Sequence, residues 1–335
     1  MPKPVLGILL GDPAGVGPEI IAKLIGRDFF LQYCNPVFIG DKRILSRAAN
    51  VVGASFAIHT VKKPADALFR PKTADLVDLK DADPGVCAFG KVCVEAGNAC
   101  LDELALAVQF CKDGKLEGFC FAPLNKAGMK EAGMDFESEH HYLASIFGVA
   151  GPFGEINVVG NLWTTRTTSH IPISQVPHAL STDKIHQAIT LCNKSLQSSG
   201  IAQPRIAVAA LNPHCGENGL CGREEIDIIR PAIEKAVAEG MVVSGPYSSD
   251  ILFIKAFRGD FDGVVTMYHD QGQIALKLRG FDEGITIGGG QPYPIVTCAH
   301  GTAYDIAGEN LVKTSSFENA VKMAAKMANH MTKRS

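Results

Sequence analysis

Short apolar runs alternate along the chain with segments in which apolar residues recur at helical spacing. The runs Val5–Leu10, Ile206–Leu211 and Gly263–Met267 predict buried strands, because each is brief and almost wholly apolar. Helical spacing is clearest within Leu101–Cys111 and Ile226–Val237. Strands that alternate with helices are typical of a parallel sheet covered by helices, so we expect an α/β fold.

Length and composition limit the class of protein. The chain has 335 residues, 46% of them hydrophobic and 20% charged, which favours two lobes and excludes a disordered protein. The net charge of −3, without a run of Lys or Arg, argues against nucleic-acid binding. The apolar run Val5–Leu10 is too short for a signal peptide, and no stretch predicts a membrane span. Ten cysteines without a C-x-x-C pair fit reduced thiols, so we expect a cytoplasmic protein.

Three histidines close apolar or β-prone segments. His170, His214 and His269 end the stretches LWTTRTTSH, IAVAALNPH and GVVTMYH. Ligands in open α/β folds gather at the carboxyl ends of strands. Three neutral imidazoles would hold a divalent metal with positions left open for substrate oxygens, and Asp270 could orient a neighbouring ligand. The alternative is three separate half-buried histidines, since sequence spacing alone does not bring them together.

Two glycine-rich segments are candidate ligand loops. GDPAGVGPEI, residues 11–20, lies between a predicted strand and helix, where backbone N–H groups could face an anion. It matches neither the G-x-G-x-x-G fingerprint nor a P-loop, so a tight turn is an equal interpretation. In Ile287–Asn310, glycine would allow a flat ligand to approach closely, and the density of Gly, Thr and His favours binding over a flexible connection.

Five motifs together resemble the 4-hydroxythreonine-4-phosphate dehydrogenase family, in the family's order and nearly end to end. They are GDPAGVGPEI (11–20), APLNKAG (122–128), LNPHCGENG (211–219), YHDQG (268–272) and HGTAYDIAG (300–308). The first and last are also similar to segments of the isocitrate and isopropylmalate dehydrogenases, whose fold this family shares. The resemblance implies a two-lobed α/β/α subunit with a cleft between the lobes. We expect a cofactor-side lobe of residues 1–130 and 285–335, and a second lobe, 131–284, with the metal ligands and the dimer interface.

The same resemblance implies an obligate homodimer with NAD or NADP, a small-molecule substrate, and one divalent metal (Zn, Mg, Mn, Co or Ni) at the dimer interface. It implies that His170, His214 and His269 are the metal ligands, with one supplied by the partner chain. Lys277 matches the family's substrate-contacting lysine. It is the candidate for proton transfer or substrate orientation, since a nearby dication would favour its neutral form. Asp270 is the second catalytic candidate, and the cofactor-binding candidates are Gly290, His300, Gly301, Thr302 and Asp305.

Four candidate substrate positions depart from the family pattern. Glu139 and His140 stand in place of a His-Thr pair, Thr286 in place of an asparagine, and Ile295 in place of an arginine. Isoleucine cannot pair with a phosphate as arginine does, and a glutamate would repel it, so the departures weigh against a phosphorylated substrate. If the loop is shifted, His141 fills the histidine position. The C-terminal segment resembles the branch of the terephthalate dihydrodiol dehydrogenases, which act on a non-phosphorylated diol.

The function that the resemblance implies is an NAD(P)- and metal-dependent dehydrogenase. It would oxidise a secondary alcohol of a small hydroxy acid or diol, with hydride passing to the nicotinamide and loss of CO2 from the resulting β-keto acid. The alternatives are a terephthalate-type cis-dihydrodiol dehydrogenase, a metal-dependent lyase or hydrolase without nicotinamide, and a non-catalytic metabolite-binding homologue. HGTAYDIAG argues against the lyase or hydrolase, and the three histidines with Lys277 argue against the non-catalytic homologue.

Overall fold

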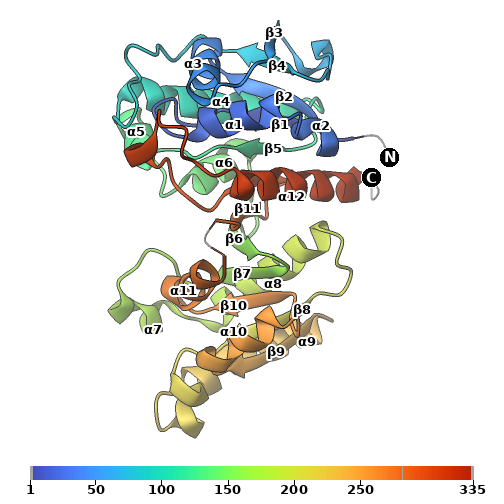
Figure 1. Cartoon of the computed structure of the whole chain (residues 1–335). Coiled ribbons are helices and arrows are strands. Elements are labelled where there is room, and N and C mark those ends of the chain that lie inside the picture. The colour runs from blue at the N-terminus through green and yellow to red at the C-terminus, as the bar shows by residue number, and fades with distance from the viewer. Residues whose placement is uncertain (1–2, 281, 333–335) are drawn as a thin grey trace. The chain divides into compact units, whose positions relative to one another are not determined.

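The chain forms two compact units in a computed structural model, which describes residues 3–280 and 282–332 (Figure 1). Unit 1 is built from two stretches, Met1–Val149 and Gln291–Ser335, and unit 2 from Ala150–Gly290. The first boundary lies later than predicted because residues 131–149 carry helix α6 (Glu139–Phe147). Leu143 of this helix is fully buried in the hydrophobic core of unit 1, which attaches the segment to that unit.

The strands of unit 1 lie in the order β3-β4-β2-β1-β5-β12, and each pairs with its neighbour in parallel. The predicted strand at Val5–Leu10 is confirmed as β1. In chain order the strands are β1 (Val5–Leu9), β2 (Asn35–Gly40), β3 (Ala57–Val61), β4 (Thr73–Asp78), β5 (Phe119–Phe121) and β12 (Ile295–Cys298). Strand β12 follows unit 2 in the sequence, so the sheet of unit 1 is built from two stretches of the chain that unit 2 separates.

Helices cover the sheet of unit 1 (Figure 1). The predicted apolar face of α4 packs against β5, with Leu104 and Val108 in the same buried cluster as Phe119 and Phe121. The helices are α1 (Gly17–Gly26), α2 (Phe30–Tyr33), α3 (Lys42–Val52), α4 (Val94–Lys112), α5 (Lys126–Glu131), α6 and α12 (Ser315–Thr332), with short 3-10 turns η1 (Pro64–Asp66) and η5 (Tyr304–Ile306).

The strands of unit 2 lie in the order β11-β6-β7-β10-β8-β9 and form a mixed sheet. The alternation of strands and helices indicates a parallel sheet, but this sheet is not parallel throughout, because β6 runs antiparallel to both β7 and β11. Gly160 (φ 59°) and Asn161 make a two-residue connection between β6 and β7, which is a hairpin geometry. The strands are β6 (Gly154–Val159), β7 (Leu162–Arg166), β8 (Arg205–Ala209), β9 (Val242–Tyr247), β10 (Gly263–Thr266) and β11 (Ile285–Gly289).

The helices of unit 2 bury apolar side chains against this sheet. Leu252 of α10 and Leu276 of α11 share a buried cluster with Val264 of β10. The helices are α7 (Val176–Ala179), α8 (Thr182–Ser198), α9 (Arg230–Ala238), α10 (Ser249–Phe257) and α11 (His269–Gly280), with short turns η2 (Ile173–Gln175), η3 (Pro213–Gly219) and η4 (Glu225–Ile229). Within residues 3–280 and 282–332, no helix combines the length and apolar character that crossing a membrane requires.

Candidate functional site

The three candidate metal ligands follow three neighbouring strands of unit 2. β10 pairs in parallel with β7 on one side and with β8 on the other, so the carboxyl ends of all three lie at one edge of the sheet. His170 follows β7, His269 follows β10 and His214 follows β8. The sequence-based expectation that these histidines share a strand-end context agrees with this topology.

Two of the histidines lie close together. The ring centroids of His170 and His269 are 5.6 Å apart. His269 Nδ1 lies 2.7 Å from Asp270 Oδ1, and because a carboxylate only accepts, Nδ1 is the donor in this contact, which in a neutral ring leaves the lone pair on Nε2. Among the described residues of unit 2, no three potential metal-ligand side chains have ligand atoms within 4.8 Å of one another, so His214 does not join the pair within one chain. The three-ligand site therefore stays a prediction that needs a second chain.

His214 opens an unusual left-handed turn. The φ angles from His214 to Asn218 are 51°, 57°, 76°, 46° and 57°, and only the third residue is glycine. A left-handed conformation costs a non-glycine residue about 1–2 kcal/mol, so the turn is strained. The fully buried Glu225 holds the entry to the turn, because its Oε1 accepts from the backbone N–H groups of Leu211 (2.8 Å) and Asn212 (2.7 Å).

The His214 side chain points to solvent, with 71% of its surface exposed, and its Nδ1 lies 2.9 Å from Glu217 Oε1. The hydrogen bond and negative charge of Glu217 raise the pKa of His214. The turn thus presents an accessible imidazole with one nitrogen already held by a carboxylate, which is an orientation suited to a ligand for a metal.

A polar network that sequence patterns did not reveal surrounds Asn157 on β6. Its Nδ2 donates to Thr286 Oγ1 (3.0 Å), while its Oδ1 accepts from Arg166 Nη1 (2.9 Å) and Gln273 Nε2 (2.6 Å). Arg166, with only 8% of its side chain exposed, also forms an ion pair with Glu155. The candidate substrate position Thr286 is therefore hydrogen-bonded within unit 2. The one sequence signal that could have indicated this network is Arg166, a charged residue at the end of the β-prone run LWTTR, because an arginine in such a place needs a partner when it is buried.

Lys277 lies on α11, two turns beyond His269, and its side chain is exposed. The same helix exposes Ile274 (59%) and Leu278 (84%). Exposed apolar side chains of this size are uncommon in clusters on the surface of a monomer and mark surfaces that contact another molecule. Helix α11 thus carries a candidate ligand, a candidate catalytic lysine and an apolar face.

The first glycine-rich segment, residues 11–20, and the last part of the second, residues 300–310, lie against each other in unit 1. They follow β1 and β12, which both pair in parallel with β5, so they share one edge of that sheet. Val16 N donates to Thr302 O (3.0 Å). The fully buried Glu19 accepts from Gly308 N (2.6 Å) and Asn310 N (3.1 Å) through its two carboxylate oxygens. Sequence spacing alone could not show this pairing.

Asp12 and Tyr304 connect the same two segments through a hydrogen bond in which the Tyr304 hydroxyl donates to Asp12 Oδ2. Burial raises the pKa of the Asp12 carboxyl, while hydrogen bonds from Tyr304 and from Ala14 N oppose the rise. Burial and the Asp12 carboxylate raise the pKa of Tyr304 as well. Both groups therefore hold their protons more firmly than usual at the base of the loops.

The candidate cofactor residues have different surroundings. An added Cβ on Gly301 would meet no heavy atom within 4 Å, which is open space for a ligand. His300 Nδ1 lies 3.0 Å from Gly301 O, Thr302 is held by its contact with Val16, and Asp305 is exposed in η5. Gly290 (φ 78°) differs, since a Cβ there would lie 2.2 Å from Pro152 O, so close packing in unit 2 accounts for this glycine.

The remaining candidate substrate positions lie in unit 1. Ile295 on β12 is fully buried in the hydrophobic core, where it packs instead of presenting its side chain to a ligand. Glu139 and His140 open α6, and His140 is 2% exposed. His141 Nδ1 lies 2.9 Å from Ser138 Oγ, so its ring contacts the residue that precedes the helix.

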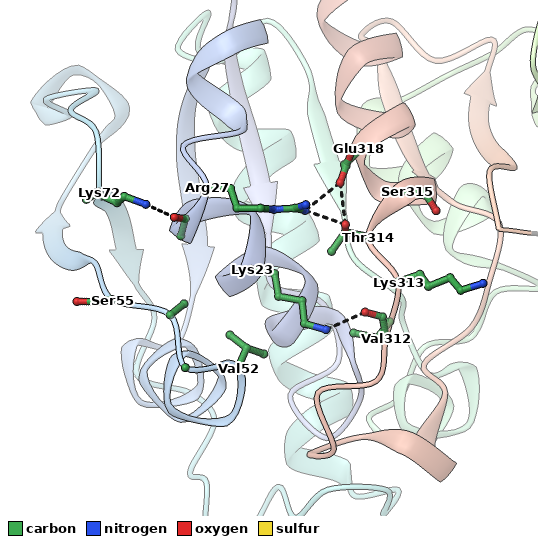
Figure 2. Close-up of a pocket in the computed structure, with 13 residues that line it drawn as sticks. Lys23, Arg27, Val52, Ser55, Lys72, Val312, Lys313, Thr314, Ser315 and Glu318 are labelled. Carbon is green, nitrogen blue, oxygen red and sulfur yellow. Dashed lines mark hydrogen bonds and ion pairs between the residues drawn. The ribbon is translucent and has the colours of Figure 1, made fainter.

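A surface pocket of about 800 Å³ in unit 1 contains none of the candidate residues (Figure 2). Its cations have intramolecular partners. Lys23 Nζ donates to Asn310 O and Val312 O, both at 2.9 Å, and Arg27 Nη2 donates to Thr314 Oγ1 (2.8 Å) and Glu318 Oε1 (2.9 Å). These contacts attach the segment after the second glycine-rich loop to α1, so we assign the pocket's polar groups to structure.

Comparison with protein families shows which family the chain belongs to. The model of the family described as "Pyridoxal phosphate biosynthetic protein PdxA" matches residues 32–324. The chain belongs to this family, which confirms the resemblance to the 4-hydroxythreonine-4-phosphate dehydrogenases.

Curated relatives span nearly the whole chain. A protein of Pseudomonas aeruginosa, named provisionally as 4-hydroxythreonine-4-phosphate dehydrogenase 2, is 42% identical over 98% of both chains. The D-threonate 4-phosphate dehydrogenase of Cupriavidus necator is 37% identical over 97% of both chains. Both names are those of dehydrogenases, which confirms the predicted enzyme class, an oxidoreductase that acts on a CH–OH group.

Solved structures give the same fold. The crystal structure of a 4-hydroxythreonine-4-phosphate dehydrogenase from Burkholderia phymatum has a TM-score of 0.84 and 35% identity, covering 97% of this chain and 98% of that one. A terephthalate 1,2-cis-dihydrodiol dehydrogenase from Burkholderia xenovorans has a TM-score of 0.67 and 27% identity, covering 96% of this chain and 98% of that one. A β-decarboxylating dehydrogenase from Thermococcus kodakarensis shares the fold alone (TM-score 0.50, 11% identity, covering 98% and 83%). The predicted α/β fold class is thus confirmed.

Proposed function

We propose that the protein is an NAD(P)-dependent dehydrogenase that uses a divalent metal to oxidise a secondary alcohol of a small hydroxy acid or diol. The observation that carries the proposal is the placement of His170, His214 and His269 after the carboxyl ends of three adjacent parallel strands. Ligand and metal sites of α/β enzymes occur at this edge. Membership of a dehydrogenase family supplies the reaction type.

The residues present suit a divalent metal. Imidazole nitrogens are ligands for Zn, Co and Ni, and open positions would be left for substrate oxygens. The contact between His269 Nδ1 and Asp270 Oδ1 (2.7 Å) leaves Nε2 of His269 available for coordination. When bound, such a metal acts as a Lewis acid that makes a substrate hydroxyl easier to deprotonate.

The protein residues have separate tasks in the proposed reaction. Lys277 takes the hydroxyl proton or orients the substrate, since it is an exposed lysine on the helix that begins with His269. Asp270 keeps the His269 ring in one orientation. The paired loops at 11–20 and 300–308 form the surface for the nicotinamide nucleotide, which accepts the hydride. We propose that CO2 is lost afterwards when a carboxylate lies β to the new ketone.

We propose that the active form is a homodimer, with one of the three histidines supplied by the second copy. The exposed Ile274 and Leu278 on α11, and Ile173 (68% exposed) in the segment after His170, support an apolar contact surface beside the candidate ligands. Replacing Leu278 by Asp should lower the dimer fraction in light scattering and the bound metal together. A fully dimeric variant with unchanged metal content would contradict the shared site.

The direct test is alanine substitution of His269, with metal analysis and NAD(P)H formation at 340 nm. We expect His269→Ala to lose both bound metal and turnover, and His178→Ala, on the short helix α7, to keep both. Turnover by His269→Ala with stoichiometric metal would refute the site. Trapping of released CO2 in the same assay decides whether decarboxylation accompanies oxidation.

A further inference from the structure

Two free cysteines of unit 1 have their sulfur atoms in contact. Cys93 Sγ lies 3.8 Å from Cys87 Sγ. Cys87 is fully buried in a small apolar cluster with Ala96 and Ala99 of α4, and the half-buried Cys93 packs against the same cluster. Two thiols at this distance, one of them reachable from solvent, are placed to form a disulfide.

The segment that joins the two thiols can change its conformation without disrupting a helix or strand. Residues 83–93 form turns and irregular structure, and Cys93 is the extended residue that precedes α4 (φ −151°). A disulfide bond is about 2.05 Å long, so the two sulfur atoms must move closer together before they can bond. The movement falls on this segment, which we call the cysteine turn.

The cysteine turn lies against both glycine-rich segments of unit 1. Gly90 N donates to Ala14 O (2.9 Å), which is in the first segment. A Cβ added to Gly308, in the second segment, would lie 2.7 Å from Phe89 Cδ2, so the Phe89 ring packs directly on that backbone. The conformation of the turn therefore affects both segments.

Arg47 of α3 connects the turn to the first glycine-rich segment. Its Nη1 donates to Cys87 O (2.8 Å), and its Nη2 donates to Pro13 O (2.6 Å). The guanidinium carbon also lies 4.2 Å from the centre of the Phe89 ring. A shift of Cys87 thus changes a set of contacts that reaches the first segment through one side chain.

We propose that Cys87 and Cys93 are a reversible oxidation site, and that a disulfide between them loosens the glycine-rich segments at residues 11–20 and 300–310. The inference goes beyond the proposed dehydrogenase function, because neither the disulfide nor its effect on these segments depends on a substrate.

The oxidant is a peroxide, and Cys93 reacts first because it is the half-buried member of the pair. Burial raises the pKa of the Cys87 thiol to about 12, so Cys87 keeps its proton at this stage. The Cys93 thiolate attacks one oxygen of hydrogen peroxide, the O–O bond breaks, and the hydroxide that leaves takes up the proton lost by the thiol. The products are a Cys93 sulfenic acid and one water.

The sulfenic acid then reacts with the neighbouring thiol. Cys87 Sγ attacks Cys93 Sγ, the S–S bond forms, the S–O bond breaks, and the Cys87 proton leaves with the hydroxide as a second water. Each sulfur has lost one electron to the peroxide, which is reduced to two waters. A dithiol such as dithiothreitol restores both thiols by exchange and becomes a cyclic disulfide itself.

The test treats the full chain with dilute hydrogen peroxide and identifies disulfides by peptide mass spectrometry. We expect a Cys87–Cys93 linkage that dithiothreitol removes. Cys93→Ser should abolish the linkage and still fold, because serine is a favoured residue at the start of a helix. Cys100→Ser, which removes the next cysteine along the sequence, should keep the linkage. A wild-type protein that forms no such linkage, or that pairs Cys93 with Cys100 instead, would overturn the proposal.

Hydrogen exchange measures the effect of the disulfide on the two glycine-rich segments. In the oxidised protein, amides of residues 11–20 and 300–310 should exchange roughly fivefold faster, as expected when a contact worth one hydrogen bond is lost. Peptides from α8 in unit 2 should exchange equally in both forms, and peroxide-treated Cys93→Ser should exchange like the reduced wild type. Equal exchange of both segments in the reduced and the disulfide-linked wild type would overturn their proposed loosening.

These results are read separately from the dehydrogenase assay. If the linkage forms and both segments exchange faster while no NAD(P)H is made in either state, the oxidation site stands and the dehydrogenase proposal fails. If NAD(P)H is made but peroxide produces no Cys87–Cys93 linkage, the reverse holds.

Discussion

The imidazole rings of His170 and His269 lie with their centroids 5.6 Å apart, although one follows β7 and the other follows β10. Their proximity results from the parallel pairing of these two strands, whose carboxyl ends reach the same edge of the sheet. His170 lies in the loop that follows β7 and His269 is the first residue of α11, so the sheet fixes where both segments begin but not the side chains themselves.

The first prediction concerns Asp270, which accepts a hydrogen bond from His269 Nδ1 at 2.7 Å. Asp270→Ala should weaken binding of Zn or Co by about 10–100-fold, because partners that orient a metal-binding histidine have effects of this size. Titration followed by calorimetry measures the affinity. Asp260→Ala, an exposed aspartate of the same unit, should leave it unchanged. Equal affinities in wild type and Asp270→Ala would show that this contact does not orient a ligand.

The second prediction concerns Asp81, both of whose carboxylate oxygens are buried without a hydrogen-bond partner. Burial raises the pKa of Asp81 from 3.8 to about 6. The native state then binds more protons than the unfolded state between about pH 4 and pH 6, so this group lowers stability as the pH rises through that window.

Asp81→Asn removes this dependence. At pH 7 the variant should be more stable than wild type by about 1–2 kcal/mol, a value reduced to allow for partial solvent contact. At pH 4 the difference should be smaller. Urea unfolding at the two pH values measures it, with the exposed Asp135→Asn as control. A variant less stable than wild type at pH 7 would mean that the Asp81 carboxylate has a favourable partner.

The third prediction concerns the close contact of α4 with α5. A Cβ added to Gly97 would lie 2.0 Å from Gly128 O, which is an impossible distance for two non-bonded atoms. Gly97→Ala should therefore lower the free energy of unfolding by about 1–3 kcal/mol, as overpacking does, despite the better helix propensity of alanine. Gly151→Ala, where no atom lies within 4 Å, should be nearly neutral. Equal stability of the two variants would contradict the packing.

The fourth prediction concerns the cysteines, all ten of which are free. At pH 8, iodoacetamide should modify the exposed Cys221 first. The fully buried Cys87 should react only after unfolding, because burial also raises the pKa of its thiol to about 12. Peptide mass spectrometry gives the order of labelling, and Cys221→Ser should remove the fast phase. Rapid labelling of Cys87 in the folded protein would show that its surroundings open readily.

Several strands of the fold, and the candidate ligand segments that follow them, could be predicted from the sequence, because apolar runs and the motifs after them are local features. Val5–Leu10 and Gly263–Met267 form strands β1 and β10, and GDPAGVGPEI and YHDQG begin directly after them. In a parallel sheet, strands of one direction end at one edge, so the residues that follow them are brought close whatever their separation in sequence.

Other features depend on pairing between distant residues and could not be predicted in the same way. β6 runs antiparallel to β7 because only Gly160 and Asn161 connect the two strands. The apolar pattern of the sequence does not show this direction, since it is the same for parallel and antiparallel strands. The contacts of Asn157 with Arg166 and Thr286 join three different strands, so their spacing carries no periodic signal. Among the described residues of unit 2, His214 does not join His170 and His269 in one cluster of ligand atoms, and the spacing of the three histidines in the sequence does not reveal this separation.

The placement of β12 in unit 1 has a consequence for synthesis of the protein on the ribosome. Strand β5 pairs with β1 on one side and with β12 on the other, and β12 is encoded after the whole of unit 2. The nascent chain therefore exposes the unpaired, apolar edge Phe119–Phe121 throughout translation of unit 2. Such an edge can pair with another strand and cause aggregation. Unit 2 is complete before unit 1 can close its sheet, so slow translation of unit 2 would prolong the period in which this edge is open to wrong pairing.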